Sequence, residues 1–160
     1  MKQIQLGGRN NTKIKGYALV DDDTFDELNQ YNWCFDGDYA SRCIKENGKW
    51  RKLKMHRIIM NPENTMQIDH IDGDKLNNQK SNLRTCTNAE NSRNKKLRSD
   101  NKSGAKGVHF SKRDKVFTAY ITFNRKNIHL GTFKEKEFAI KAYNDAALMY
   151  FNKFANLNTV

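Results

Sequence analysis

Short apolar runs broken by polar turns fill the first third of this chain of 160 residues. Residues 15–20 predict a strand, and the aspartates before Thr24 can cap a short helix over 25–29. An Asn47-Gly48 turn between the runs 39–44 and 50–55 predicts a β-hairpin. Five large apolar side chains are expected to anchor a core in this region: Trp33, Phe35, Tyr39, Trp50 and Leu53.

The middle of the chain is denser in polar side chains, and its apolar runs are shorter. Four short elements are predicted here: a helix at 56–60, a strand at 67–70, a returning strand at 83–85 and the start of a helix at 88–94. A loop through Gly73 joins the two strands. Two strands followed by a helix make a small ββα unit.

Regular alternation returns after residue 104. Three antiparallel strands are predicted at 108–110, 117–123 and 127–133, followed by one amphipathic helix at 135–151. The apolar face of the strands should pack on a helix stripe of small and apolar residues: Ala139, Ala142, Tyr143, Ala146 and Met149. The expected fold class is therefore α+β, with a ββα unit followed by a three-stranded antiparallel sheet packed on one helix.

Charge is concentrated where these two parts of the chain join. The formal net charge is +11, and residues 84–115 carry ten basic side chains against three acidic ones. Residues 95–103 are polar and charged, so we interpret them as a basic linker between an N-terminal domain, 1–94, and a C-terminal domain, 104–160. A basic protein of this size attracts polyanions, of which DNA is the commonest.

The cysteines and the N-terminus give expectations about compartment. Cys34, Cys43 and Cys86 are odd in number and lack CxxC spacing, so neither a disulfide framework nor a four-cysteine zinc site is expected. The N-terminus lacks the apolar run of a signal peptide, and no stretch is long enough to span a bilayer. We expect a monomeric cytoplasmic protein in a reducing compartment.

The adjacent pair Asp69-His70 is the strongest candidate for chemistry. Hydrolysis of a phosphodiester needs a nucleophilic water, a base and a cation on the phosphate. Neighbouring residues on a strand point to opposite faces, so both reach one site only if the strand ends or bends there, which the Gly73 loop allows. Asn91, on the first turn of the next helix, can add a neutral oxygen ligand. Taken alone, an Asp-His pair is more often structural.

The ordered set of Asp69-His70, Asn82 and Asn91 resembles the HNH motif of homing and phage nucleases, in the variant with Asn at the last position. Three further runs resemble the intron-encoded and phage subgroup: HRIIM at 56–60, DHIDGDKLNN at 69–78 and SNLR at 81–84. The resemblance covers roughly residues 14–94. It implies a phosphodiester hydrolase that leaves a 5′-phosphate and a 3′-hydroxyl, encoded by a phage or mobile element and acting in the host cytoplasm.

The resemblance also implies a role for each residue of the set. Asp69 and Asn91 bind the divalent metal, Mg²⁺ or Mn²⁺, and His70 is the general base that activates water. Asn82 is structural, and its amide ties the loop between the two strands. An asparagine in place of the last histidine suits Mg²⁺ or Mn²⁺ better than zinc.

The C-terminal part resembles the ethylene-response-factor (APETALA-type) domain, which lays a three-stranded sheet in the major groove of DNA. The similarity rests on Lys106-Gly107-Val108, the run 117–121, the run 130–133, the run 139–147 and Asn156-Leu157-Asn158.

Together the two resemblances imply double-stranded DNA as the partner. Basic side chains contact phosphates, and amide or aromatic side chains on a sheet can contact base edges. The candidate DNA-binding residues are His56, Arg57, Arg93, Lys95, Lys96, Lys106, His109, Lys112, Arg113, Lys115, Tyr120, Thr122, Asn127 and His129. The alternative for the sheet face is an ordinary solvated surface.

Three functions are compatible with these features. The first is a metal-dependent DNA endonuclease of the homing type. The second is a DNA-binding regulator whose HNH unit does not cut, and the third is a basic structural protein that packs on DNA. The presence of the whole motif favours the nuclease.

Overall fold

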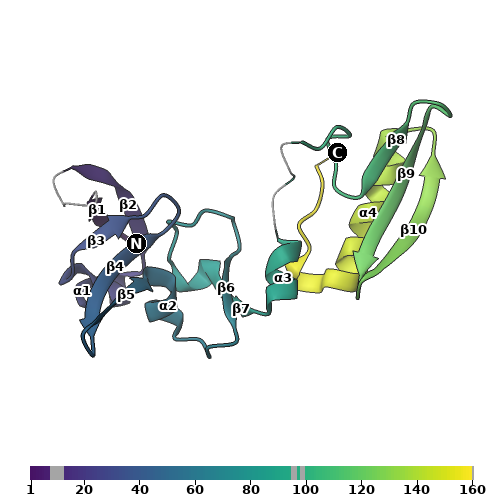
Figure 1. Cartoon of the computed structure of the whole chain (residues 1–160). Helices are drawn as coiled ribbons and strands as arrows, with labels where there is room; N and C mark the ends of the chain where they lie inside the picture. Colours follow the sequence, from purple (N-terminus) through teal and green to yellow (C-terminus); the bar gives the residue numbers. More distant parts are fainter. Residues whose placement is uncertain (8–12, 95–96, 98–99, 160) are drawn as a thin grey trace. The chain divides into compact units, whose positions relative to one another are not determined.

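The computed structural model describes residues 1–7, 13–94, 97 and 100–159. The chain divides into two compact units, Met1–Asn91 and Ser92–Val160 (Figure 1). Both units combine helices with antiparallel strands, so the expected α+β class is confirmed. Across the described ranges, no helix has the length and apolar character needed to cross a membrane.

A five-stranded sheet in the order β2-β1-β3-β4-β5 builds most of the first unit. Its strands are β1 (Lys2–Gly7), β2 (Ile14–Val20), β3 (Trp33–Phe35), β4 (Ala40–Glu46) and β5 (Lys49–Lys54). All neighbours are antiparallel except β1 and β3. Helix α1 (Asp22–Asn29) begins after Asp21 and joins the same core, whose buried residues are Ile4, Leu6, Ala18, Val20, Leu28, Trp33, Ala40 and Met55.

The predicted hairpin is confirmed, but one of its expected core anchors is wrong. Trp33 is buried, whereas Trp50 is 73% exposed. Trp50 pairs with Lys45 near the hairpin turn, and only the other end of β4 is buried. The indole therefore extends past the apolar core into water.

The ββα unit follows directly, and the first compact unit includes it as far as Asn91 in its last helix. Its elements are α2 (Met55–Met60), β6 (Gln67–His70), the 3-10 turn η1 (Lys80–Asn82), β7 (Leu83–Cys86) and α3 (Asn88–Arg93). Strands β6 and β7 pair antiparallel, with Asp69 opposite Arg84 and His70 opposite Leu83. The sequence predicted both helices and both strands to within about two residues, but not the turn η1.

The second unit is a three-stranded antiparallel sheet covered on one face by a long helix (Figure 1). The strands lie in the order β10-β9-β8. The elements are β8 (Val108–Ser111), β9 (Val116–Phe123), β10 (Lys126–Phe133), α4 (Lys136–Phe151) and the 3-10 turn η2 (Asn152–Phe154).

Of the five α4 residues predicted to pack on the sheet, four do so. Ala139, Tyr143 and Ala146 are buried, and Ala142 packs against the core, but Met149 is 73% exposed. The buried stripe also includes Ile140, Ala147 and Phe151, which were not predicted. Met149 lies on the outer side of the helix because the stripe turns away from it over the last two turns.

Asparagine side chains close the ends of this unit. Asn158 accepts a hydrogen bond from the Lys106 backbone N–H at 2.7 Å and donates one to the Lys106 carbonyl at 3.1 Å. Asn144 on α4 exchanges hydrogen bonds with the Asn158 backbone at 2.9 and 3.0 Å. Asn101 and Ser103, which the sequence assigned to the linker, bind the Ala105 carbonyl at 3.2 and 2.9 Å.

Replacing Gly107 by alanine is expected to destabilise the second unit by roughly 3 kcal/mol or more, because overpacking adds to an unfavourable backbone. Gly107 has φ +67°, and a Cβ there would lie 2.2 Å from Tyr143 Cδ2 and 2.3 Å from the Tyr120 carbonyl. Urea unfolding of the full chain measures the change. The control is Gly104→Ala, where φ is +71° but the nearest atom is the mobile Lys136 Nζ at 3.2 Å. Equal losses in the two variants would contradict this explanation.

Candidate active site

Asp69 and His70 lie at the end of β6 and point to opposite faces of the β6–β7 pair. Each is only 5% exposed. Asp69 shares its face with Arg84, its partner across the strands, and with Cys86. His70 lies on the other face with Leu83, on the side where His56 and Tyr39 pack.

The carboxylate of Asp69 is held by Arg84. Arg84 donates two hydrogen bonds to Asp69 Oδ2, at 2.8 Å from Nε and 2.6 Å from Nη2. The two side chains are 6% and 13% exposed, so the ion pair is largely removed from water. The guanidinium compensates the buried negative charge and fixes the orientation of the carboxylate.

Cys86 lies between Asp69 and the start of α3. Burial raises the pKa of the Cys86 thiol, the carboxylates of Asp69 and Glu90 raise it further, and the backbone N–H of Asn91 opposes them. The Asn91 N–H therefore donates to the thiol, and Cys86 shares its face of the strand pair with Asp69. The structure brings these two segments into one neighbourhood.

A capping box fixes the first turn of α3. The Thr87 side chain accepts a hydrogen bond from the Glu90 N–H at 3.2 Å, and Glu90 Oε2 accepts from the Thr87 N–H at 2.8 Å. Asn91 follows Glu90 directly, and its N–H donates to the Thr87 carbonyl at 3.0 Å. These bonds hold Asn91 at a fixed point after β7.

Asn82 ties together the loop that joins the two strands. Its Nδ2 donates to Asp72 Oδ1 and to the Asn77 carbonyl, both at 2.9 Å, and its Oδ1 accepts from the Asp72 N–H at 3.1 Å. The Ile71 N–H donates to the Asn82 carbonyl at 2.9 Å. These hydrogen bonds fix the path of the backbone that follows His70.

The imidazole of His70 packs in a cluster of rings. His56 meets it edge to face, with centroids 5.1 Å apart and planes at 88°. Tyr39 lies 4.9 Å from His56 and 6.1 Å from His70 between centroids. Burial lowers the pKa of His70, and the amide of Asn78 with nearby aspartates opposes the shift. The ring is thus kept neutral and oriented.

Tyr39 reaches this cluster through a tight turn at Asp36. The Asp36 carboxylate accepts from the Tyr39 N–H at 2.8 Å and from Lys52 Nζ at 3.0 Å. Although burial raises the pKa of Asp36, these hydrogen bonds lower it to about 2. An ionised Asp36 therefore holds the turn that aims Tyr39 at the histidines.

Acidification is expected to destabilise the first unit because His56 is buried in its neutral form. Burial and then His70 lower the pKa of His56 from 6.5 to about 3. Between these pKa values the unfolded chain binds more protons than the folded one. The free energy of unfolding therefore decreases as the pH is lowered. The slope from His56 is at most about 1.4 kcal/mol per pH unit. Urea unfolding in the upper part of this window should show a shallower slope for His56→Gln, and equal slopes would argue against the buried neutral ring.

The donor atoms at this site suit a hard divalent cation. A carboxylate from Asp69 and an amide oxygen from Asn91 are oxygen ligands, and Mg²⁺ needs only one or two such protein ligands. In the described part of the chain, no three His, Cys, Asp or Glu side chains converge on one point, as a closed zinc site would require. The donor types therefore suit Mg²⁺ or Mn²⁺, and Arg84 bonds to one of the two Asp69 carboxylate oxygens, Oδ2.

The two candidate phosphate contacts in the first unit are engaged within the fold. His56 is 5% exposed and faces His70. Arg57 donates from Nη1 to the Met66 carbonyl at 3.1 Å. His56 therefore supports the neighbouring histidine, which the sequence did not indicate.

Most of the candidate DNA contacts in the second unit lie on the sheet face away from α4. His109, Tyr120, Thr122, Asn127 and His129 are all exposed, and Tyr120, Thr122 and His129 alternate with buried or half-buried neighbours. Tyr120 stacks on His129 with centroids 5.1 Å apart, and Thr122 contacts Asn127 at 3.5 Å. One polar and aromatic face is thus assembled from three strands.

The basic candidates in the second unit are spread over several surroundings. Arg113 and Lys115 are exposed beside the turn after β8. Lys106 binds the Asn156 carbonyl at 3.4 Å, and burial lowers its pKa. The Arg93 guanidinium lies 4.8 Å from the centroid of the Phe151 ring. Lys95 and Lys96 lie outside the described residues.

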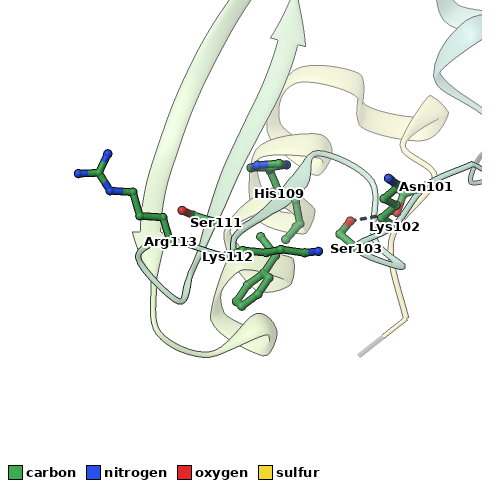
Figure 2. A pocket seen from close by; sticks show the side chains of 9 residues that line it. Asn101, Lys102, Ser103, His109, Ser111, Lys112 and Arg113 are labelled. Atoms are coloured by element: carbon green, nitrogen blue, oxygen red, sulfur yellow. Dashed lines mark hydrogen bonds between the residues drawn. The ribbon is translucent and has the colours of Figure 1, made fainter.

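A hollow of about 670 Å³ opens beside the edge strand β8. Figure 2 shows His109, Lys102 and Lys112 around it, with Ser103 bonded to Asn101, whereas Arg113 extends away from the other side chains. The lining combines basic side chains with polar ones and with the apolar Val108 and Phe110 of β8.

Comparison with known proteins identifies the family. Residues 54–93 match the family model described as HNH endonuclease. A protein of Acanthamoeba polyphaga mimivirus named Uncharacterized HNH endonuclease L560 is 31% identical over 150 residues, which are 90% of this chain and 75% of the relative. The chain belongs to the HNH endonuclease family. Protein 3.8 of Escherichia phage T7 is 42% identical to this HNH chain over 59 residues, 37% of the chain and 49% of the phage protein.

Several residues of this HNH site were missed in the sequence. Thr87 and Glu90 carry the T-x-x-E signature of a capping box, so their role could have been predicted from the sequence. Arg84 stands opposite Asp69 only once the strand register is known. Tyr39 comes from outside the matched segment and gives no local signal of its role.

Proposed function

We propose that this HNH family member is a divalent-metal-dependent DNA endonuclease of the homing type that hydrolyses phosphodiester bonds. The observation that carries the proposal is the local geometry at the end of β6. The last two residues of β6 are a buried carboxylate held by Arg84 and a buried imidazole, and the Asn91 N–H of α3 donates to Cys86 on the face that carries Asp69.

His70 is the general base in this proposal. Its lowered pKa leaves the ring unprotonated near neutral pH, so that it can accept a proton from the attacking water. His56 holds the ring by an edge-to-face contact, Tyr39 packs at a tilt to it, and the Asn78 amide hydrogen-bonds to it. Asp69 and Asn91 would hold the cation, which when bound supplies charge stabilisation to the phosphate and to the leaving oxygen.

The second unit binds double-stranded DNA in this proposal, in the manner of an APETALA-type domain. The exposed face of β8–β10 carries amide, hydroxyl and aromatic groups that can contact base edges. Lys112, Arg113 and Lys115 lie beside the turn between β8 and β9, where they can neutralise phosphates. Binding is therefore expected to weaken steeply with salt, and a flat salt response would contradict this role.

Cleavage of supercoiled plasmid tests the proposal. Incubation with Mg²⁺ or Mn²⁺ is expected to convert it to nicked or linear DNA with 5′-phosphate and 3′-hydroxyl ends, and EDTA is expected to abolish conversion. If the full chain binds the plasmid but leaves it intact with every divalent metal tried, the chain is a DNA-binding regulator and the nuclease proposal is rejected.

A further inference from the structure

The hairpin β4–β5 projects its charged residues from two distinct faces. Pairing places Lys45 opposite Trp50 and Cys43 opposite Lys52, with Lys54 next along the same face. This face, here called the lysine face, consists of Lys45, Trp50, Lys52 and Lys54 with Ser41 and Cys43. The other face carries Arg42, Ile44, Glu46, Lys49, Arg51 and Leu53.

The lysine face leads to the candidate active site. Lys54 Nζ lies 3.9 Å from the centroid of the Tyr39 ring, on which Lys75 Nζ also lies at 5.1 Å. Tyr39 in turn contacts the rings of His56 and His70. A row of ammonium groups therefore runs along the lysine face of the β4–β5 hairpin. It ends at Tyr39, which contacts the ring of the proposed general base, His70.

The charge on this row suits a polyanion. Within the described residues, Lys52 pairs with Asp36 at 3.0 Å and Lys75 with Asp38, while neither Lys45 nor Lys54 has an acidic side chain within 4.0 Å. The face itself contains no acidic residue, whereas the opposite face contains Glu46, which pairs with Arg51 at 3.1 Å. Both faces are thus positively charged, but only the lysine face is free of acidic residues of its own, and it is the face whose Lys54 lies on Tyr39.

Trp50 adds an apolar contact to this row. Trp50 is 73% exposed, pairs with Lys45 and lies on a strand that contains four basic residues. Aromatic groups interleaved with lysines are typical of surfaces that follow a nucleic-acid backbone, where bases or sugars cover the ring. None of these ribbon residues before Lys54 lies in the segment that matches the family model.

We propose that the lysine face of β4–β5 binds the backbone of the DNA that enters the His70 site, with Trp50 covered by the DNA. The proposal rests on the proposed function for the identity of its ligand. It assigns to the five-stranded sheet, which precedes the matched segment except for Lys54, the role of guiding DNA to the catalytic centre.

Two matched double variants test the proposal in the full chain carrying His70→Ala, which prevents cleavage during measurement. Lys45→Gln/Lys52→Gln removes two charges from the lysine face, and Lys49→Gln/Arg51→Gln removes two from the opposite face. Each pair contains one side chain that is ion-paired in the fold. Affinity for a short DNA duplex is measured by fluorescence anisotropy over a range of salt concentrations.

The first variant is expected to bind roughly tenfold more weakly, with a salt slope lower by about 1.8 because two phosphates are no longer neutralised. The second is expected to stay within about twofold of the parent. Equal losses in both variants, or no loss in either, would overturn the proposal. Absence of any DNA binding by the parent would overturn it as well.

Trp50 reports on the same contact by fluorescence. The chain has two tryptophans, and Trp33 is only 1% exposed, so acrylamide quenching comes from Trp50. DNA is expected to reduce this quenching, and unchanged quenching in the DNA complex would count against the proposal. If the wild-type chain cleaves plasmid and the two double variants bind DNA equally well, only the proposal for the lysine face fails. If the lysine-face variant binds weakly but wild type never cleaves, only the nuclease proposal fails.

Discussion

His70→Ala is expected to slow DNA cleavage by a factor of roughly 10³, because a positioned general base contributes about 10²–10⁴ to such a reaction. DNA affinity should change little, since His70 is 5% exposed and packs against His56 rather than facing outward. Single-turnover cleavage of plasmid under saturating protein measures the chemical step, and anisotropy with uncut duplex measures binding.

Added imidazole provides the control for this variant. The substitution leaves a ring-sized space beside His56 and Tyr39, which free imidazole can fill and where it can accept the proton. Partial recovery of cleavage with imidazole, and none with a similar concentration of an unrelated buffer, is the expected result. Cleavage by His70→Ala at the wild-type rate would remove His70 from the mechanism.

Asp69→Asn is expected to abolish measurable cleavage and also to destabilise the first unit by about 3–5 kcal/mol. The amide is a weaker ligand for a hard cation than the carboxylate. It also leaves the guanidinium of Arg84, 13% exposed, without its counter-charge, and an uncompensated buried charge costs about this much. Plasmid cleavage and urea unfolding report the two effects separately.

The double variant Asp69→Asn/Arg84→Gln separates stability from catalysis. Removing both charges leaves two neutral groups that can bond to each other, so much of the lost stability should return. Cleavage should not return, because the ligand for the cation is still missing. Recovery of cleavage together with stability would show that Asp69 serves only as the partner of Arg84.

Local patterns were enough to predict nearly every element of the second unit and the ββα unit. Alternation in 117–123 and 127–130 indicated both the strands and the polar face, because strand side chains alternate, whereas the register shift at His129/Gly131 breaks the alternation in β10. Strands β1 and β3 were not predicted. β1 pairs parallel with β3 across α1 and β2, and such long-range pairing leaves no local pattern.

The wrong core assignments have a common cause. Trp50 and Met149 are large apolar residues at positions that match a strand or helix period, and both are 73% exposed. Periodicity shows which residues share a face but not how far along an element the partner surface extends. The β4–β5 hairpin extends beyond the core, so Trp50 near its turn is exposed. In α4 the buried stripe has already turned towards Phe151 at the position of Met149.

The motif residues of the candidate site could be named from the sequence, but their support could not. Asp69 and His70 are adjacent in the chain, yet each depends on a partner distant in sequence, Arg84 for the first and Tyr39 for the second. These partners follow from strand register and from the fold of the five-stranded sheet. His56 likewise has a basic side chain suited to phosphate, but burial keeps it neutral and turns it towards His70.

Direct measurement of Mn²⁺ binding tests the central claim most directly. Electron paramagnetic resonance of free Mn²⁺ is recorded while the full chain carrying His70→Ala is titrated in the presence of duplex DNA. We expect one bound Mn²⁺ per chain, with affinity at least tenfold weaker when Asp69→Asn/Arg84→Gln or Asn91→Ala is added. Equal Mn²⁺ affinity in all three proteins, or none in the parent, would contradict a cation held by Asp69 and Asn91 beside His70.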